Sequence, residues 1–132
     1  MMIGLDTNVV VRFLTNDDVK QANAVKARLR SVGDSGDKAY FSKISMLETV
    51  WVLSSVYEFE DEIILDGLDH FAQLPMIALE DPDLLARLKG LYSKKGPGLA
   101  DQLILADYVF NGCSTVITFD KRAKMLAGFS AV

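Results

Sequence analysis

Four acidic residues lie at positions from which their carboxylates could act together, although they are far apart in the chain: Asp6, Glu48, Asp101 and Asp120. Carboxylates held close together repel each other, so they stay ionised together only when a cation joins them. Ligand sets made of oxygen alone suit Mg²⁺ or Mn²⁺. A bound Mg²⁺ polarises a phosphoryl oxygen and lowers the pKa of a bound water that can attack phosphorus. These residue types therefore indicate metal-assisted phosphoryl chemistry.

No histidine, cysteine or lysine belongs to this set, so the metal would have to activate the nucleophile and stabilise the developing charge. Asn8 and Thr118 are candidates for a supporting role, because polar groups near a metal orient its ligands or a bound water. Basic residues near the predicted ends of elements are candidate phosphate contacts, which position a substrate without reading its sequence. These residues are Lys43, Lys94, Lys95, Lys121 and Arg122.

The elements that must position the acids alternate between short strands and helices. Strands are predicted at residues 2–5, 39–41, 76–79, 115–118 and 129–132. Helices are predicted at residues 8–14, from a cap at Asp17 to a loop over residues 31–38, and at residues 45–56, 61–74, 81–92, 99–111 and 121–127. This alternation predicts a three-layer α/β/α sandwich with a central, mainly parallel sheet. We expect a single domain over residues 1–132.

In such a fold the carboxyl ends of the strands and the N-termini of the helices share one edge of the sheet, where ligands bind. Asp6 ends the first predicted strand, and Asp120 lies two residues beyond the fourth. Glu48 lies near the start of one predicted helix, and Asp101 lies in the first turn of another. We therefore expect all four acids to gather at one edge.

Each acid also has a simpler explanation when it is considered alone. Asp6 and Asp120 could be turn residues or helix N-caps, which is what an aspartate after a strand usually is. Asp101 could simply favour a helix N-terminus, where a negative charge interacts well with the helix dipole. Their common placement at one predicted edge is the argument for a shared function.

Glu48 has the most specific alternative. The run from Ser45 to Glu48 fits a capping box, in which the glutamate reaches back to the serine amide. However, Ile44, Trp51 and Val52 are at helical spacing from Glu48 and belong to its face. A glutamate on an apolar face is unfavourable unless it is paired or binds a metal.

Composition limits the class of protein. The 132 residues suffice for one domain with a sizeable core, and the 50% apolar content leaves apolar surface for a partner. The net charge of −4 comes from 18 acidic and 14 basic residues, so the remaining charges balance once the four acids are set aside. A single cysteine excludes an internal disulfide and a cysteine-based metal cage. Without a signal-peptide pattern or an apolar run of about 18 residues, we expect a soluble cytoplasmic protein.

The ordered motifs resemble those of the PIN-domain nucleases. Asp6-Thr7-Asn8 is similar to the opening motif of that family, and the serine-led stretch Ser42–Leu53 contains its glutamate. Leu99–Ile104 and then Thr118-Phe119-Asp120 are similar to its closing pair of motifs. The resemblance spans essentially the whole chain, and the length and the Leu126–Phe129 tail look like those of the VapC toxins of toxin–antitoxin pairs.

The resemblance implies endonucleolytic cleavage of RNA with Mg²⁺ or Mn²⁺, a homodimer, and an antitoxin that covers the active site. Carried over by position, it implies that the metal-site and catalytic acids are Asp6, Glu48, Asp101 and Asp120, supported by Asn8 and Thr118. The candidate contacts to the RNA substrate are Arg12, Lys43, Lys94, Lys95 and Lys121. Arg12 has the alternative of contacting an antitoxin or pairing with Asp17. Two departures from the family pattern are Gln102 after the third acid and Lys121-Arg122-Ala123 after the fourth, which leaves the geometry of Asp120 the least certain.

Other functions remain as alternatives. A phosphatase of the haloacid-dehalogenase type needs a second carboxylate two residues after its first aspartate, where this chain has Asn8. A receiver-like phospho-acceptor needs an acidic pair and a late lysine that are not evident. The main alternative is a catalytically silent PIN-like module that binds RNA or a protein partner, although the presence of all four acids favours the enzyme.

Overall fold

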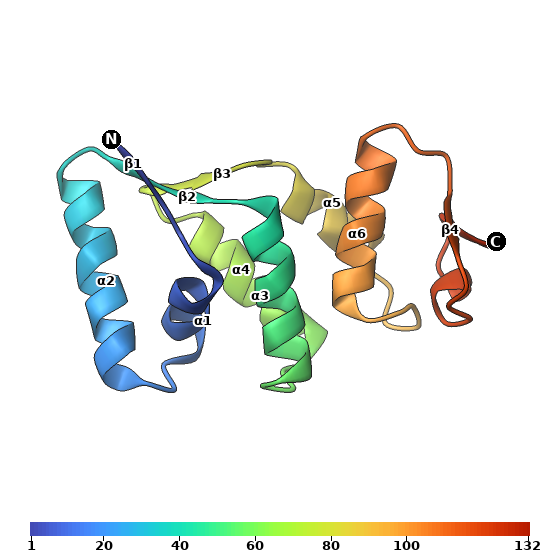
Figure 1. The fold of residues 1–132 in the computed structure, drawn as a ribbon, viewed down its shortest axis with the longest axis horizontal. Coiled ribbons are helices and arrows are strands. Elements are labelled where there is room, and N and C mark those ends of the chain that lie inside the picture. The colour runs from blue at the N-terminus through green and yellow to red at the C-terminus, as the bar shows by residue number, and fades with distance from the viewer. The chain divides into compact units, whose positions relative to one another are not determined.

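A computed structural model describes residues 1–132, and in it the chain divides into two compact units (Figure 1). The N-terminal unit comprises Met1–Pro82 and the C-terminal unit comprises Asp83–Val132. Both consist of helices and parallel strands, which confirms the predicted α/β class. The single domain over residues 1–132 stays a prediction.

The N-terminal unit is built on a three-stranded parallel sheet. Its elements are β1 (Met2–Gly4), α1 (Thr7–Thr15), α2 (Val19–Asp34), β2 (Lys38–Phe41), α3 (Lys43–Ser55), α4 (Asp61–Ala72) and β3 (Ile77–Leu79). The strand order is β1-β2-β3, with Ile3 opposite Ala39 and Ala39 opposite Ile77. In Figure 1 the helices of this unit lie below its strands. Because the three strands are parallel, their carboxyl ends lie at the same edge of the sheet. At this edge β1 leads into α1 and β2 leads into α3.

Side-chain caps fix where three helices of this unit begin. The carboxylates of Asp6 and Asp18 accept hydrogen bonds at the starts of α1 and α2, and the Ser42 hydroxyl does so at the start of α3. The predicted cap at Asp17 is therefore wrong by one residue. The predicted loop over residues 31–38 is also too long, because α2 continues to Asp34. Gly36, at φ +74°, provides the left-handed backbone of the turn that follows.

Aromatic side chains join the sheet of this unit to its helices. Phe41 on β2 and Phe71 on α4 are each 1% exposed, with ring centroids 5.6 Å apart in an edge-to-face arrangement. Phe13 on α1 packs against Phe71 at 5.1 Å. Edge-to-face pairs at such distances are favourable in addition to the area that they bury. This cluster fixes α1, and thus Asp6 at its start, relative to β2.

The C-terminal unit contains two helices and a second parallel sheet. Its elements are α5 (Leu84–Leu91), α6 (Leu99–Phe110), β4 (Val116–Thr118), the 3₁₀ turn η1 (Ala123–Met125) and β5 (Phe129–Ala131). Strands β4 and β5 pair in parallel, with Ile117 opposite Ser130. The short helix predicted over residues 121–127 is too long, since only the 3₁₀ turn η1 forms there. The ten residues 119–128 leave too little chain for a full helical crossover between parallel strands.

A close approach of backbone to helix positions β5 in this unit. Gly128 has φ +107°, which side-chain-bearing residues rarely adopt. A Cβ atom there would lie 3.0 Å from Cδ1 of the fully buried Leu105 on α6. Glycine therefore lets the chain turn into β5 while it touches α6.

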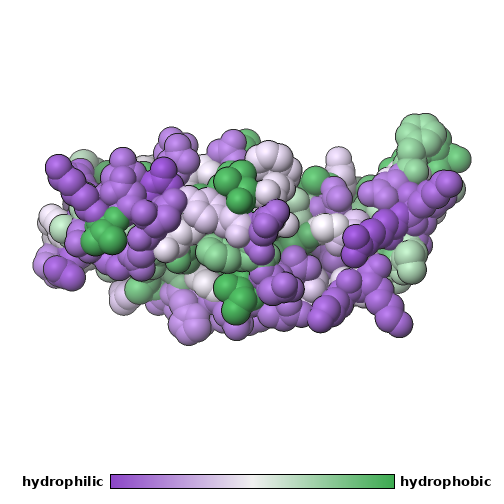
Figure 2. All heavy atoms as spheres, turned by 90° about the horizontal axis from the view of Figure 1, so that it is seen from below, coloured by the Kyte–Doolittle hydropathy of each residue, from purple (hydrophilic) through white to green (hydrophobic).

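The surface carries exposed apolar side chains in both units. Ile44 and Trp51 on α3 are 81% and 55% exposed, and Ile117 and Phe119 at β4 are 65% and 87% exposed. On the face drawn in Figure 2, hydrophobic residues are interspersed among hydrophilic ones. None of the helices has the length and apolar character needed to cross a lipid bilayer.

Candidate active site

Asp6 lies between β1 and α1 and caps the helix. Its Oδ1 accepts a hydrogen bond from the Thr7 amide at 2.9 Å, and the residue is exposed. Asn8 lies in the first turn of the same helix and is also exposed. The capping explanation thus accounts for one carboxylate oxygen of Asp6. The other oxygen has no hydrogen bond, so it is available to a ligand.

Glu48 lies in the second turn of α3 and its side chain has no hydrogen bond or ion pair. The capping box proposed for Ser45 and Glu48 does not form, because the helix begins earlier. Ser42 accepts the hydrogen bond from the Ser45 amide instead, at 3.1 Å. Glu48 is exposed, as are Ile44 and Trp51 on either side of it. The structure therefore gives Glu48 no local partner.

Lys43 at the start of α3 is joined to a residue that sequence reasoning missed. Its amide donates to Oε1 of Glu80 at 2.9 Å, and its Nζ lies 3.9 Å from the other carboxylate oxygen. Glu80 directly follows β3, so this contact joins the carboxyl ends of two neighbouring strands. The position of Glu80 after a strand was the signal that could have revealed it.

Asp101 and Asp120 lie close enough in the C-terminal unit to influence each other electrostatically. Asp101 is the third residue of α6, and its side chain has no hydrogen bond or ion pair. Asp120 follows β4, and its amide donates to the Thr118 hydroxyl at 3.0 Å. Its Oδ1 accepts from the amides of Arg122 at 2.8 Å and Ala123 at 3.3 Å. Asp120 thus caps the turn η1 with one oxygen and leaves the other free.

The pKa of Asp101 is raised above its ordinary value of 3.8. The main cause is partial withdrawal of the carboxyl group from water, and the negative charge of Asp120 adds to it. A cation placed at these two carboxylates would act against both effects, because it favours the charged form.

Within the C-terminal unit Asp101 and Asp120 lie near each other, and the gathering of all four acids stays a prediction. Within each unit, no three Asp, Glu, His or Cys side chains form a group that could hold a metal ion. The donor chemistry of the pair nevertheless fits Mg²⁺. That ion is often held by one or two carboxylates, with waters and substrate phosphates completing its shell.

Two further residues support the acids of the C-terminal unit. The side chains of Gln102 and Arg122 both contact the backbone of the loop that leads into α6. Both lie at the positions where the sequence departs from the PIN pattern. The signal for Gln102 was its place among the apolar residues of α6, where a buried amide must find partners.

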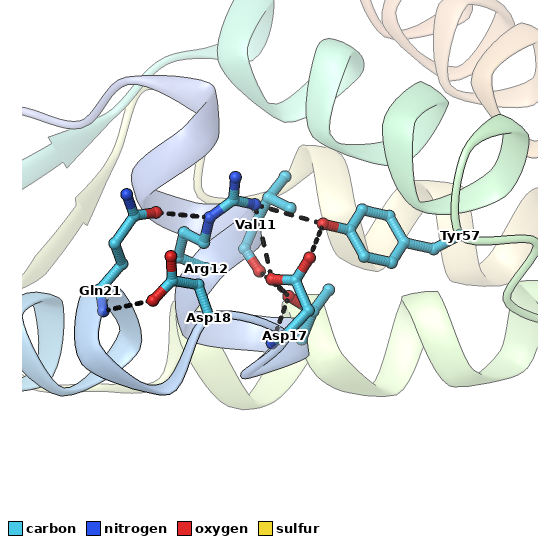
Figure 3. Close-up of polar contacts among 7 residues, drawn as sticks. Val11, Arg12, Asp17, Asp18, Gln21 and Tyr57 are labelled. Carbon is cyan, nitrogen blue, oxygen red and sulfur yellow. Dashed lines mark hydrogen bonds and ion pairs between the residues drawn. The ribbon is translucent and has the colours of Figure 1, made fainter.

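Arg12 takes part in a hydrogen-bonded network at the far end of α1 (Figure 3). Its guanidinium donates to Gln21 at 2.7 Å and to the Tyr57 hydroxyl at 3.2 Å, and lies 3.5 Å from Asp17. Tyr57 in turn donates to Asp17 at 2.5 Å. The tyrosine bond is the main cause that lowers the pKa of Asp17, and the carboxylate raises the pKa of Tyr57. The structure thus shows the pairing with Asp17 that the sequence left open.

Comparison with known protein families identifies the family of the chain. The PIN domain family matches residues 3–128, which is nearly the whole length. The chain therefore belongs to the PIN domain family, whose members are generally nucleases and often metal-dependent ribonucleases. No curated protein matches the chain in a sequence comparison.

Proposed function

We propose that this protein is a metal-dependent endoribonuclease that hydrolyses phosphodiester bonds in RNA. The observation that carries the proposal is the Asp101–Asp120 pair, in which one carboxylate has no partner and the other keeps a free oxygen. Membership of a nuclease family supports the same chemistry. The proposed metal-site and catalytic acids are Asp6, Glu48, Asp101 and Asp120.

Each of these residues has a defined task in the proposal. The carboxylates would hold Mg²⁺ or Mn²⁺, and the chemistry supplied by the ion would be activation of a water and neutralisation of charge on the phosphate. Thr118 holds the backbone of Asp120 through its hydroxyl, so it orients that acid. Asn8, in the first turn of α1 and two residues after Asp6, provides an exposed amide.

The distribution of charge supports RNA binding by the C-terminal unit. Residues 83–132 contain seven Lys and Arg but four Asp, a net charge of +3, although the whole chain carries −4. Lys94, Lys95 and Lys121 are exposed there, and we propose that they contact RNA phosphates. Arg12 and Lys43 stay weaker candidates, because each already has an acidic partner in the N-terminal unit.

We further propose that the protein acts as a VapC-like toxin in the cytoplasm. The basis is the resemblance of length and motifs to that group. In this proposal the protein is a homodimer and an antitoxin inhibits it. The exposed apolar side chains of α3 and β4 offer surface for such contacts, because large exposed apolar groups mark interaction sites.

RNA cleavage by the purified chain tests the activity directly. We expect cleavage with Mg²⁺ or Mn²⁺, none with EDTA, and a loss of about 100-fold or more in Asp6→Asn. Asp66→Asn is the matched control, because Asp66 is an exposed acid on α4 that has no assigned role. The nearly isosteric change should leave the fold intact, as circular dichroism would show.

A non-catalytic PIN module is the second candidate function. It is favoured by the lack of any group of three acids within either unit. In that case the chain would bind RNA without cutting it in any divalent metal. Should Asp6→Asn cleave RNA as fast as the parent, the assigned catalytic centre would be wrong.

A further inference from the structure

Residues Ser93–Gly98 form the loop between α5 and α6, and Gln102 holds this loop from its buried side. The Gln102 side chain is fully buried, and its Oε1 accepts from the Ser93 amide at 2.9 Å. Its Nε2 donates to the carbonyls of Ser93 at 2.9 Å and Pro97 at 2.8 Å. Loss of this amide would leave the buried carbonyl of Pro97 and the partly buried amide and carbonyl of Ser93 without this partner, which is unfavourable. Gln102 therefore fixes both ends of the loop.

Arg122 holds the same loop from a different element. Its Nε donates to the carbonyl of Gly96 at 2.9 Å, across 26 residues of sequence. Its own amide donates to Oδ1 of Asp120 at 2.8 Å. Arg122 thus contacts Asp120 through its backbone and the loop through its side chain.

The loop is tightly packed at Gly96 and Pro97. A Cβ atom at Gly96 would lie 3.1 Å from Nε2 of Gln102 and 3.3 Å from the Ser93 carbonyl. Pro97 is buried beside it, and Gly98 then caps the start of α6. The path of the loop therefore determines where α6 begins.

Asp101 depends on this arrangement more than Asp120 does. Asp120 is held by hydrogen bonds to two backbone amides, whereas the Asp101 side chain has no partner. The position of Asp101 is consequently set only by the first turn of α6, which follows the loop. Any shift of the loop would change the separation of the two carboxylates.

We propose that Arg122 is a positioning residue: together with Gln102 it fixes the Asp101 end of α6 relative to the turn that carries Asp120. The catalytic meaning of this clamp rests on the proposed function. Misplacing a reacting group by about 1 Å can reduce a rate 100-fold, so the clamp matters for turnover and not for substrate affinity. Arg122 itself need not touch RNA.

Three substitutions separate this role from phosphate binding. Arg122→Gln keeps an N–H donor at the place of Nε but removes the charge. Arg122→Lys keeps the charge but has a methylene group at that place, and Arg122→Ala removes both. Lys124→Ala is the matched control, because it removes an exposed charge from the same turn.

The clamp itself is measured without RNA, by amide hydrogen exchange of residues 93–101. In Arg122→Ala and in Gln102→Met, we expect exchange of these amides to accelerate about tenfold or more. Arg122→Gln and Lys124→Ala should exchange like the parent. Equal protection in Arg122→Ala and the parent would overturn the clamp.

Kinetics with RNA and saturating metal test its catalytic meaning. We expect kcat to fall about tenfold or more in Arg122→Ala and Arg122→Lys, to be retained in Arg122→Gln, and KM to change no more than in Lys124→Ala. The opposite order, with Lys active and Gln impaired mainly in KM, would overturn positioning in favour of a phosphate contact. If the parent cleaves no RNA in any metal, the proposed function fails, and with it the catalytic role of Arg122. Hydrogen exchange still decides the clamp in that case.

Discussion

The two units of the chain differ in net charge and in how their acidic residues are placed. Residues 1–82 carry fourteen Asp and Glu against seven Lys and Arg, a net charge of −7, and residues 51–82 contain no Lys or Arg at all. The C-terminal unit is basic, yet the pKa of Asp101 is raised there by partial burial and by the nearby negative charge of Asp120. Scattered surface acids affect solubility, whereas two acids held together inside a basic unit indicate a site. Whole-chain charge hides this difference.

The two units also differ in how many hydrogen-bond partners an acidic side chain has. In the N-terminal unit the Arg12–Asp17–Tyr57 network satisfies its acid with three partners, including Thr15. In the C-terminal unit Asp101 has none, although Gln102 beside it is fully satisfied. A satisfied acid stabilises the fold, while an unsatisfied one held in place is available to a ligand. The comparison therefore distinguishes the hydrogen-bonded carboxylate of Asp17 from the unbonded carboxylate of Asp101.

The largest expected effect tests whether catalysis draws on both units. Glu48→Gln and Asp101→Asn should each lower kcat about 100-fold or more, because each removes a proposed metal ligand. Glu62→Gln, at an exposed acid of α4, is the control and should cleave like the parent. Single-turnover cleavage at saturating RNA measures this. Full activity in Glu48→Gln would confine the catalytic acids to fewer elements than proposed.

A smaller effect is expected from reversing charge in each unit. Lys94→Glu with Lys95→Glu should weaken RNA binding about tenfold or more, and should reduce the salt slope by about 0.7 per lost phosphate contact. Lys20→Glu with Arg30→Glu, both exposed on α2, makes the same charge change in the acidic unit. Fluorescence anisotropy in EDTA measures both pairs without cleavage. Equal losses would show that net charge matters and not its location.

Stability should distinguish two glycines of the clamped loop. Gly96→Ala should lower the free energy of unfolding by about 1–2 kcal/mol, because the new methyl group would press on the bonded Gln102 amide. Gly98→Ala, where a Cβ would meet nothing within 4 Å, should change it by about 0.5 kcal/mol or less. Urea unfolding compares the two. A milder effect at Gly96 would mean that Gln102 can move.

The smallest expected effect concerns pH and the N-terminal network. Because folding lowers the pKa of Asp17, its ionised carboxylate stabilises the fold at pH values above the ordinary pKa of 3.8. This stabilisation is lost as the pH falls through the lowered pKa. Because folding raises the pKa of Tyr57, its protonated hydroxyl stabilises the fold at pH values below the ordinary pKa of 10.0. This stabilisation is lost as the pH rises through the raised pKa.

Tyr57→Phe removes the hydrogen bond responsible for both shifts. Its melting temperature should therefore be slightly lower than that of the parent at neutral pH, and the gap should narrow in acid and in strong base. Thermal melts from pH 2 to 11 measure it. A gap that stays constant over this range would assign the loss to packing instead.

Much of the fold could be predicted from local pattern, and the errors come from contacts between residues that are far apart in the chain. The predicted α4 begins at the observed residue, Asp61, because charge and apolar spacing agree there. Asp17 and Asp18 are equally good caps by sequence, but Asp17 is taken by Tyr57, forty residues away. No window of sequence shows that bond. The short crossover between β4 and β5 likewise depends on which strands pair.

The candidate site was predicted at the level of residue types and less so at the level of contacts. Spacing after strands made Asp6 and Asp120 candidates, and helix position made Asp101 a candidate. It did not show that Asp120 uses one oxygen to cap η1, or that Lys43 pairs with Glu80. The contacts of Gln102 and Arg122 could not be predicted either, because both side chains bind backbone atoms, which every residue type has.

The clamp on Ser93–Gly98 grips carbonyl and amide groups and makes no use of the side chains of Lys94 and Lys95. These two positions can therefore change in evolution, or in the laboratory, without altering the path of the loop. In the proposed function, substitutions at these two positions would change the contacts to RNA phosphates and keep the arrangement of the carboxylates. The loop separates what must be conserved from what is free to diverge.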